Sequence, residues 1–319
     1  TYDPFGGTSA ASPGIAGVFT MLHSAYQQLN NDETAEAALL KACLLNSAND
    51  IGNQGPDFKF GWGLVNALRA ARVLEENRYL SAEIEQAETN THTIEIPANV
   101  VQAKIMVYWA DKDAAINANQ ALVNNLDATI IDPVGEISYP WILDHTPNAT
   151  SLDLPATTGV DNLNNVEQVS LFNPAEGTYT FQIDGTEIPF GPVKYYVTYD
   201  FIYDEIEVIY PYGGESLVPG ESENIHWDAP RNSTDDFTLS YSSDNGASWS
   251  NIGTAQGDKR QFEWVIPSDI SGQCLVRVER NGVSDSSDFN FTIAEVPQNI
   301  YPTQVCPNTM TLTWDPMAD

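Results

Sequence analysis

The sequence predicts a multidomain chain in which a helical segment precedes all-β domains. Residues 8–80 carry apolar side chains at helical spacing, whereas from about Thr91 the apolar period falls to two residues. At roughly 150 residues per domain, a chain of 319 residues is long enough for two or more domains. With 42% hydrophobic and 10% aromatic residues, the composition is typical of packed domains and not of a disordered chain.

The charge balance excludes two classes of partner. The chain has 44 acidic and 13 basic side chains and a net charge of −31, so it repels phosphate backbones and anionic lipid headgroups. We therefore expect no nucleic-acid partner. No apolar run approaches the roughly 18 residues of a membrane span, so none is expected. The acidic, Asn- and Asp-rich composition with few lysines is typical of a secreted, extracellular protein.

The two ends of the sequence indicate a piece of a longer protein. Neither a starting Met nor a signal-peptide pattern stands at Thr1, and the last residues end inside an expected strand. We therefore expect an internal fragment.

Three helices are expected in the first eighty residues. The first, Ser9–Gln28, is small and apolar on nearly all sides, which is typical of a helix buried in the centre of a larger domain. The second begins with an acidic first turn at Asp32 and continues through Leu45. After a Gly- and Pro-rich loop, the third runs from about Trp62 to Leu74, with arginines towards its end.

Alternating apolar residues then predict two groups of strands, separated by Asn, Asp, Gly and Pro clusters. The spacing of the first group is typical of a sandwich or jelly roll, and the density of the second is typical of an immunoglobulin-like sandwich. Residues 301–314 resemble the opening of one more module. The expected strands are Thr93–Ile96, Ala103–Trp109, Asp127–Ile131, Glu167–Phe172, Gly177–Ile183 and Val193–Phe201 in the first group, and Glu205–Ile209, Glu223–His226, Phe237–Ser242, Ser248–Ile252, Gln261–Val265, Cys274–Glu279 and Asp288–Ile293 in the second.

The clearest chemical motif lies at the start of the first helix, in Gly7-Thr8-Ser9-Ala10-Ala11-Ser12-Pro13. A serine in the first turn of a buried helix has backbone N–H groups and the helix dipole directed at the atom that its Oγ attacks, which favours acyl transfer. Gly7 permits close backbone approach by a substrate, and Thr8 is expected to cap the helix. A Thr-Ser cap before an ordinary helix looks much the same, so the motif alone does not decide between the two.

A second segment adds to this motif: Gly61-Trp62-Gly63-Leu64-Val65-Asn66-Ala67. Together the two segments resemble the catalytic-serine helix and the closing Gly-x-Gly-x-Val-Asn-Ala segment of the subtilisin-like serine proteases, the subtilases of peptidase family S8. The resemblance implies that Ser9 is the nucleophile and that its N–H is half of the oxyanion hole. Gly7, Thr8 and Pro13 are the motif residues around it. Ala10 and Ser12 depart from the usual residues without touching the chemistry.

The resemblance also implies which catalytic groups lie outside this sequence. In subtilases the triad order is Asp, His, Ser, so both partners of Ser9 belong upstream, as does the oxyanion Asn. The four histidines, His23, His92, His145 and His226, all follow the serine, and none stands in a family position. We therefore expect this chain alone to be inactive. Its partners would be the upstream half of the catalytic domain and a protein or peptide substrate.

Residues 91–203 resemble the jelly-roll β-domain that follows the catalytic domain in some bacterial alkaline subtilases. The matching segments are 105–111, 122–127, 161–167 and 174–179. Relatives often bind calcium there, and calcium takes about six to eight oxygen ligands. The resemblance implies a structural calcium and no cofactor for catalysis; the alternative is that the Asn and Asp residues only make turns. The candidate ligands are Asp111, Asp113, Asn125, Asp127, Asp161, Asn165 and Glu167.

Two further features have structural explanations. Residues 242–249 fit the Ser-x-Asp-x-Gly-x-x-Trp Asp-box, which in a single copy predicts a β-hairpin and no catalysis. Cys43, Cys274 and Cys306 are too few and too far apart for a disulfide framework or a metal site. Each is expected to be a small buried apolar residue.

The sequence thus predicts four parts. Residues 1–80 are a helical C-terminal remnant of an α/β subtilase domain, 88–203 a jelly-roll (P-domain-like) β-domain, 204–294 an immunoglobulin-like β-sandwich, and 295–319 the start of a fibronectin-III-like module. The predicted function is that of a fragment of a secreted subtilisin-like serine endopeptidase, which hydrolyses peptide bonds through Ser9. The alternative is a non-catalytic array of β-modules for adhesion or for binding a substrate or surface.

Overall fold

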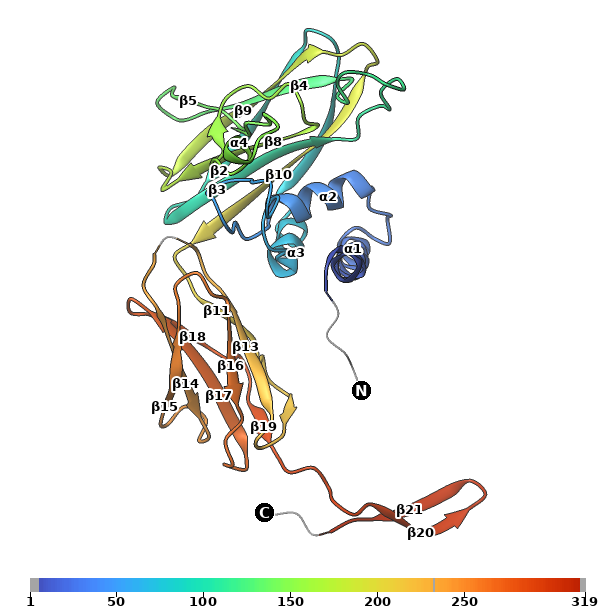
Figure 1. Cartoon of the computed structure of the whole chain (residues 1–319), viewed down its shortest axis with the longest axis vertical. Helices are drawn as coiled ribbons and strands as arrows, with labels where there is room; N and C mark the ends of the chain where they lie inside the picture. The colour runs from blue at the N-terminus through green and yellow to red at the C-terminus, as the bar shows by residue number, and fades with distance from the viewer. Residues whose placement is uncertain (1–5, 232, 316–319) are drawn as a thin grey trace. The chain divides into compact units, whose positions relative to one another are not determined.

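The computed structural model describes residues 6–231 and 233–315, and the chain divides after Tyr203 into two compact units (Figure 1). Strands form most of the regular structure, and the described helices all lie in the first unit, before Asp153. This confirms the predicted order of a short helical part followed by an all-β part.

The helical segment contains α1 (Thr8–Leu29), α2 (Ala37–Asn46) and α3 (Ala67–Glu75). The predicted acidic first turn of the second helix is wrong. Asp32 has a left-handed φ of 65°, so it lies in the turn between α1 and α2 and cannot belong to a helix. The first turn of α2 carries no acidic residue.

The third helix starts later than predicted, at Ala67 and not near Trp62. The Asn66 side chain accepts the N–H of Arg69 at 2.9 Å, which caps α3. The residues before it are held out of the helix by an antiparallel bridge between Asn49 and Leu64. Gly63 directly precedes the bridge residue Leu64 and has a φ of 114°, a backbone conformation outside the helical region.

Two antiparallel sheets pack face to face to form the first sandwich, residues 79–203. Their strand orders are β1-β10-β3-β8 and β2-β9-β4-β5, and the core between them includes Ile105, Phe181 and Val197. The bounds are β1 (Tyr79–Ile84), β2 (Thr89–Ile96), β3 (Val100–Trp109), β4 (Asn125–Ile131), β5 (Ile137–Ser138), β8 (Val166–Phe172), β9 (Gly177–Glu187) and β10 (Val193–Tyr203), with the short pair β6 (Trp141–Ile142) and β7 (Thr157–Thr158) and the helix α4 (Ala149–Leu152).

The first sheet begins before the residues predicted for it. Strand β1 pairs with β10 from Tyr79 opposite Thr198 to Ile84 opposite Val193. Its sequence follows α3 almost directly and carries few β-branched residues, so the apolar pattern did not separate it from the helix. The helical segment and the first sandwich are therefore joined by only a short turn.

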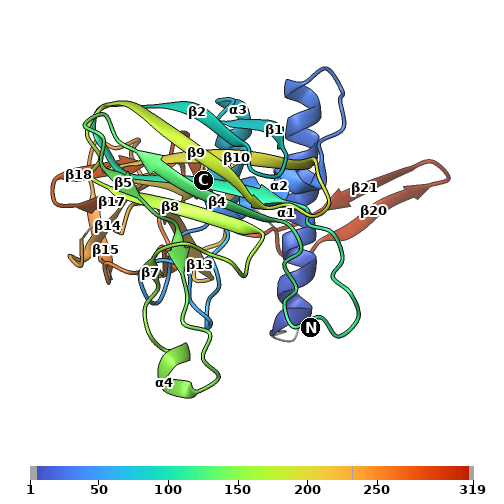
Figure 2. The same cartoon turned by 90° about the horizontal axis from the view of Figure 1, so that it is seen from above.

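Sheet β1-β10-β3-β8 is buried on both faces. On the face away from the sandwich core, Met106, Tyr108, Tyr196 and Thr198 are at most 7% exposed. Helices α2 and α3 cover this face, and Figure 2 shows the length of α1 beside them. An apolar cluster joins Leu22, Leu40 and Val73 of the helices to the two tyrosines. The helical segment and the first sandwich thus form one compact unit.

The second unit is a two-sheet sandwich followed by a hairpin. The strand orders are β11-β13-β16 and β12-β19-β17-β14-β15, and β18 pairs with β17. The expected hairpin over residues 242–249 is present, because β14 pairs with β15 across it. The bounds are β11 (Glu207–Tyr210), β12 (Ser216–Leu217), β13 (Ser222–Asp228), β14 (Phe237–Ser242), β15 (Ser250–Ala255), β16 (Gln261–Val265), β17 (Ser271–Arg280), β18 (Val283–Ser286), β19 (Phe291–Ile293), β20 (Tyr301–Cys306) and β21 (Thr309–Thr313).

The cysteine predictions hold for two of the three residues. Cys43 and Cys274 are free and buried, whereas Cys306 is exposed at the end of β20. The expectation of a buried Cys306 is wrong, because both faces of the β20–β21 hairpin are open within the described residues.

Gly63 and Gly61 provide a matched test of the bridge that positions α3. A Cβ on Gly63 would lie 2.1 Å from the Asn49 carbonyl oxygen, whereas a Cβ on Gly61, at a φ of 61°, meets nothing within 4 Å. We expect Gly63→Ala to lower the free energy of unfolding of the first unit by about 3 kcal/mol and Gly61→Ala by only about 1 kcal/mol. Urea unfolding of the whole chain measures both; equal losses would contradict this explanation.

Candidate active site

Ser9 is the second residue of α1, and its side chain is exposed. The residue at the N-cap is Gly7, with φ 81° and ψ −174°, a backbone conformation essentially reserved for glycine. The expectation that Thr8 caps the helix is wrong. Thr8 already has a helical position, and no side-chain cap hydrogen bond is made.

The first turn of α1 is held at the Gly7 carbonyl. The N–H groups of Ala10 and Ala11 both donate to it, at 3.0 and 3.1 Å. Pro13 lies inside the helix and has no N–H to donate to the Ser9 carbonyl. Since the first N–H groups of a helix have no partner within it, the positive end of the α1 dipole lies beside the Ser9 hydroxyl.

The described histidines do not supply a base for Ser9. His23 stands on the same helix about 21 Å further along the axis. His92 is 2.7 Å from the Tyr195 hydroxyl on the first sandwich, and burial lowers its pKa. His145 is exposed in the loop after β6, and His226 lies on β13 of the second unit. Within residues 6–231 and 233–315, Ser9 Oγ makes no hydrogen bond that would activate it.

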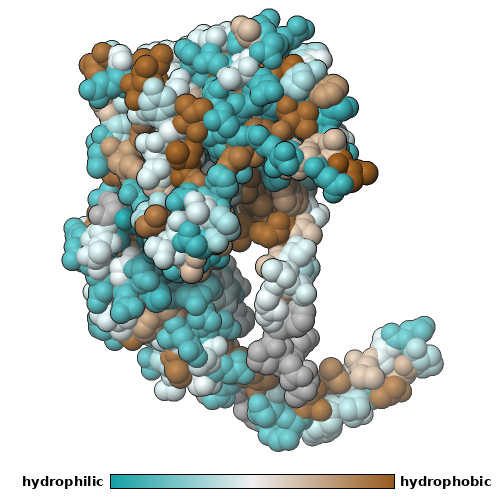
Figure 3. Space-filling model, turned by 45° about the horizontal axis from the view of Figure 1, so that its top comes forward, coloured by the Kyte–Doolittle hydropathy of each residue, from teal (hydrophilic) through white to brown (hydrophobic). Residues whose placement is uncertain are grey.

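We predicted that α1 is buried on nearly all sides, but the structure buries it on one side only. Leu22 is buried against α2 and α3, while Ile15, Val18 and Phe19 are half-buried and Met21 is 60% exposed. The surface shown in Figure 3 is mainly hydrophilic and is interrupted by apolar patches. Within the described residues, α1 therefore keeps an apolar side that no other element covers.

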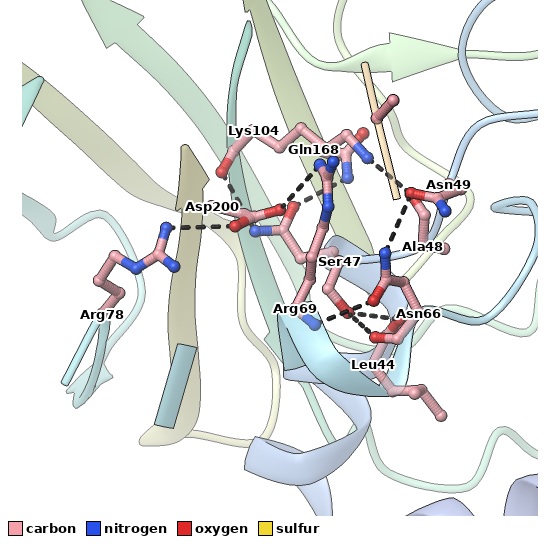
Figure 4. Close-up of polar contacts among 12 residues, drawn as sticks. Leu44, Ser47, Ala48, Asn49, Asn66, Arg69, Arg78, Lys104, Gln168 and Asp200 are labelled. Carbon is pink, nitrogen blue, oxygen red and sulfur yellow. Dashed lines mark hydrogen bonds and ion pairs between the residues drawn. The ribbon is translucent and has the colours of Figure 1, made fainter. Parts of the chain in front are cut away.

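A polar network that the sequence did not indicate holds α2 against the sheet (Figure 4). The Asn46 amide nitrogen, at the end of α2, donates to the carbonyls of Lys104 and Thr198, each at 3.1 Å. Its amide oxygen accepts from Gln168 at 2.8 Å. The buried Lys104 ammonium donates to the Ala48 carbonyl at 2.6 Å. These residues are far apart in the sequence, so no local pattern could have found them.

The network includes one buried carboxylate, Asp200 on β10 (Figure 4). Arg78 Nη1 lies 3.1 Å from Asp200 Oδ1, and Arg69 Nη1 lies 3.9 Å from Asp200 Oδ2. Arg69 belongs to α3, and Arg78 lies between α3 and β1, so a single side chain of the sheet contacts both the helix and the link that follows it.

Four of the seven predicted metal ligands do not gather around a common point. Asp111 accepts the backbone N–H groups of Val123 and Asn124 and so closes the loop between Asp111 and Val123. Asp161 accepts those of Leu163 and Asn164, as expected of a turn-forming carboxylate. The Asn165 amide donates to the Trp109 carbonyl at 2.6 Å, and Asp113 is exposed.

The other three predicted ligands lie at one edge of the first sandwich. Glu167 of β8 reaches across to the other sheet, where its Oε2 accepts the N–H of Ala128 on β4 at 2.7 Å. Asn125 and Asp127 stand on that same strand. One buried oxygen on each residue, Asn125 Oδ1, Asp127 Oδ1 and Glu167 Oε1, has no hydrogen-bond partner.

Burial raises the pKa of Glu167 well above its ordinary value, and the negative charges of Asp127 and Asp161 raise it further. The edge therefore collects acceptor oxygens and negative charge, and one oxygen of each of these three residues has no donor. Among the described residues, no three His, Cys, Asp or Glu side chains come together as a metal-binding set. The donor set at this edge has two carboxylates and an amide, which suits calcium and not a soft metal.

Residues 1–63 match the model of the subtilase family, Peptidase_S8. The segment contains Ser9 and the Gly61-Trp62-Gly63 part of the closing motif. Neisserial autotransporter lipoprotein NalP of Neisseria meningitidis serogroup B, in strains MC58 and H44/76, is 41% identical to this chain over 64 residues. The matched part is 20% of this chain and 5% of NalP, so the chain spans only a small share of that relative.

Solved structures resemble the chain only distantly. The adhesin domain of Epf from Streptococcus pyogenes is 8% identical with a TM-score of 0.26, covering 69% of this chain and 78% of that one. The fibronectin(III)-like modules of CbhA from Clostridium thermocellum are 11% identical with a TM-score of 0.21, covering 64% and 95%. Likenesses at this level do not establish a shared fold. None of the described helices is long and apolar enough to cross a membrane.

A substitution at Gly7 tests whether its conformation holds the first turn of α1, which carries Ser9. A Cβ on Gly7 would meet nothing within 4 Å, so Gly7→Ala adds backbone strain alone. We expect this strain to open the first turn and to speed hydrogen exchange at Ala10 and Ala11 by about tenfold. Exchange in α3 should stay unchanged. If Ala10 and Ala11 keep their protection, Gly7 does not hold the turn.

Proposed function

We propose that this chain is the C-terminal part of a secreted subtilisin-like serine endopeptidase, with Ser9 as its nucleophile. The observation that carries the proposal is the position of Ser9. It lies exposed in the first turn of α1, after a cap that only glycine adopts, and inside the segment that matches the subtilase model.

In the proposed reaction, Ser9 Oγ attacks the scissile peptide carbonyl while an upstream His takes the hydroxyl proton. An upstream Asp orients that His. The N–H groups at the start of α1 are positioned to stabilise the negative charge on the carbonyl oxygen. The His then gives its proton to the leaving amine, and water releases the acyl group from Ser9. The described residues supply the nucleophile and the helix dipole, and the other groups come from the upstream half.

The β-part of the proposal assigns the first sandwich to a jelly-roll domain that follows the catalytic domain. Its two four-stranded antiparallel sheets support this assignment. We assign residues 204–294 to an immunoglobulin-like sandwich and the β20–β21 hairpin to the start of a fibronectin-III-like module. A secreted location is supported by the acidic composition and by the likeness to an autotransporter lipoprotein.

Labelling with a fluorophosphonate tests Ser9. We expect no stoichiometric labelling of residues 1–319, because without the His base the hydroxyl is not activated. When the upstream half is present, we expect rapid labelling that Ser9→Ala abolishes. Ser12→Ala, one turn along the same helix, is the matched control and should label normally. Absence of Ser9 labelling in the presence of the upstream half would contradict the protease proposal and would favour a non-catalytic binding array.

We further propose that calcium binds at the β4–β8 edge of the first sandwich, through Asn125, Asp127 and Glu167. Each of these three side chains has one buried oxygen without a hydrogen-bond partner, which supports the proposal because an uncompensated buried carboxylate oxygen is unfavourable. Bound calcium would neutralise the charge and join the two sheets at this edge. Asp111, Asp113, Asp161 and Asn165 are not included, since they are engaged elsewhere or exposed.

Thermal unfolding of residues 1–319 with calcium and with a chelator tests this site. At free calcium about 100 times the dissociation constant, the first unit should gain about 2.7 kcal/mol. Glu167→Gln should remove most of this gain and should stabilise the calcium-free protein, because it removes a buried charge. Asp113→Asn is the control and should respond to calcium as the unchanged chain does. An identical calcium response in Glu167→Gln would exclude the assigned ligand set.

A further inference from the structure

The serine helix is supported mainly by α3. Helix α1 packs along α3, and Leu22 of α1 lies in the same apolar cluster as Val73 and Leu74 of α3. One ring contact, Tyr26 against Tyr79 at 6.3 Å, links the end of α1 to the start of β1. The orientation of α1, and with it the position of Ser9, therefore depends on where α3 is held.

One carboxylate of the sheet contacts α3 near its start and the chain that links α3 to β1. Arg69, near the start of α3, and Arg78, three residues after its end and next to β1, both pair with Asp200 (Figure 4). Asp200 is 2% exposed, and the arginine side chains are 11% and 9% exposed. A carboxylate so deeply buried is stable as an anion only with such partners, so the pairing specifies one position of α3 on the strand.

The distribution of charge supports a dedicated role for this contact. Lys104 lies opposite Asp200 in the register of β3 and β10 and is itself buried. Two of the 13 basic side chains of a chain with a net charge of −31 thus pair with one buried carboxylate, and a third lies on the neighbouring strand opposite it. Asn46 fixes α2 to the same two strands through the Lys104 and Thr198 carbonyls. The sheet therefore holds both helices beneath α1 by polar contacts of defined direction.

We propose that Asp200 is a positioning residue for Ser9, acting through Arg69 and Arg78 on α3 and through α3 on α1. This inference rests on the proposed function of Ser9. It assigns the first sandwich a part in catalysis: its outer face is the support on which the serine helix is aligned. Small displacements of a nucleophile are costly, since about 1 Å can reduce a rate by about 100-fold.

The first arm of the test needs no activity and uses residues 1–319. Asp200→Asn keeps the shape of the side chain and removes the charge that both arginines need. We expect hydrogen exchange in α3 and α1 to rise by about tenfold, with β2, β9 and β4 unchanged. Asp132→Asn, in the turn after β4, is the matched control and should leave the helices protected. Unchanged exchange in α1 after Asp200→Asn would overturn the coupling.

The second arm uses the protease together with its upstream half, at a temperature where each variant is fully folded. We expect Asp200→Asn to lower kcat and the rate of fluorophosphonate labelling of Ser9 by about tenfold or more, with little change in KM. Asp200→Glu, which keeps the charge, should restore part of the rate. A variant that is folded and as fast as the unchanged enzyme would overturn the positioning role. If the unchanged enzyme does not label, the proposed function fails, while the first arm still decides whether Asp200 holds α1.

Discussion

The outer face of sheet β1-β10-β3-β8 sets the construction of the first unit. An antiparallel sheet commonly leaves one face to solvent, but this one carries Met106, Tyr108 and Tyr196 on the face away from the sandwich core. Such side chains require a cover. Helices α2 and α3 provide it, and every polar group that the cover buries has to find a partner, because each one left unpaired costs about 1–3 kcal/mol.

Asn46 and Asp200 provide several of these partners. Asn46 ends α2 and uses its amide to satisfy a carbonyl on each of two neighbouring strands, together with the Gln168 side chain. Asp200 does the same for the charges of α3. Apolar packing alone would let the helices slide over the sheet, whereas these contacts have fixed directions and fix one arrangement. The helical segment is thereby part of the β-unit on which it lies, although residues 1–63 match the model of the subtilase family.

The sequence predicted what depends on local pattern. Most strands of both sandwiches follow from period-two runs such as Ala103–Trp109, and the position of Ser9 at the start of a helix follows from the motif around it. It could not predict contacts between distant residues. Asn46 and Thr198, like Asp200 and Arg69, are ordinary polar residues in the sequence, and only the fold brings each pair together. For the same reason, seven oxygen-bearing residues looked alike in the sequence. Only the fold separates Asp111, which closes a loop, from Glu167, which reaches across to β4.

Native-state hydrogen exchange of the unchanged chain, followed in increasing urea, tests most directly whether the helical segment and the first sandwich are one structural unit. We expect the amides of α2 and α3 to open together with those of β3 and β10, with the same free energy and the same dependence on urea. The second unit should open independently. If α2 and α3 exchange through a separate, lower-energy opening while β3 and β10 stay protected, the helices rest on the sandwich without being part of it.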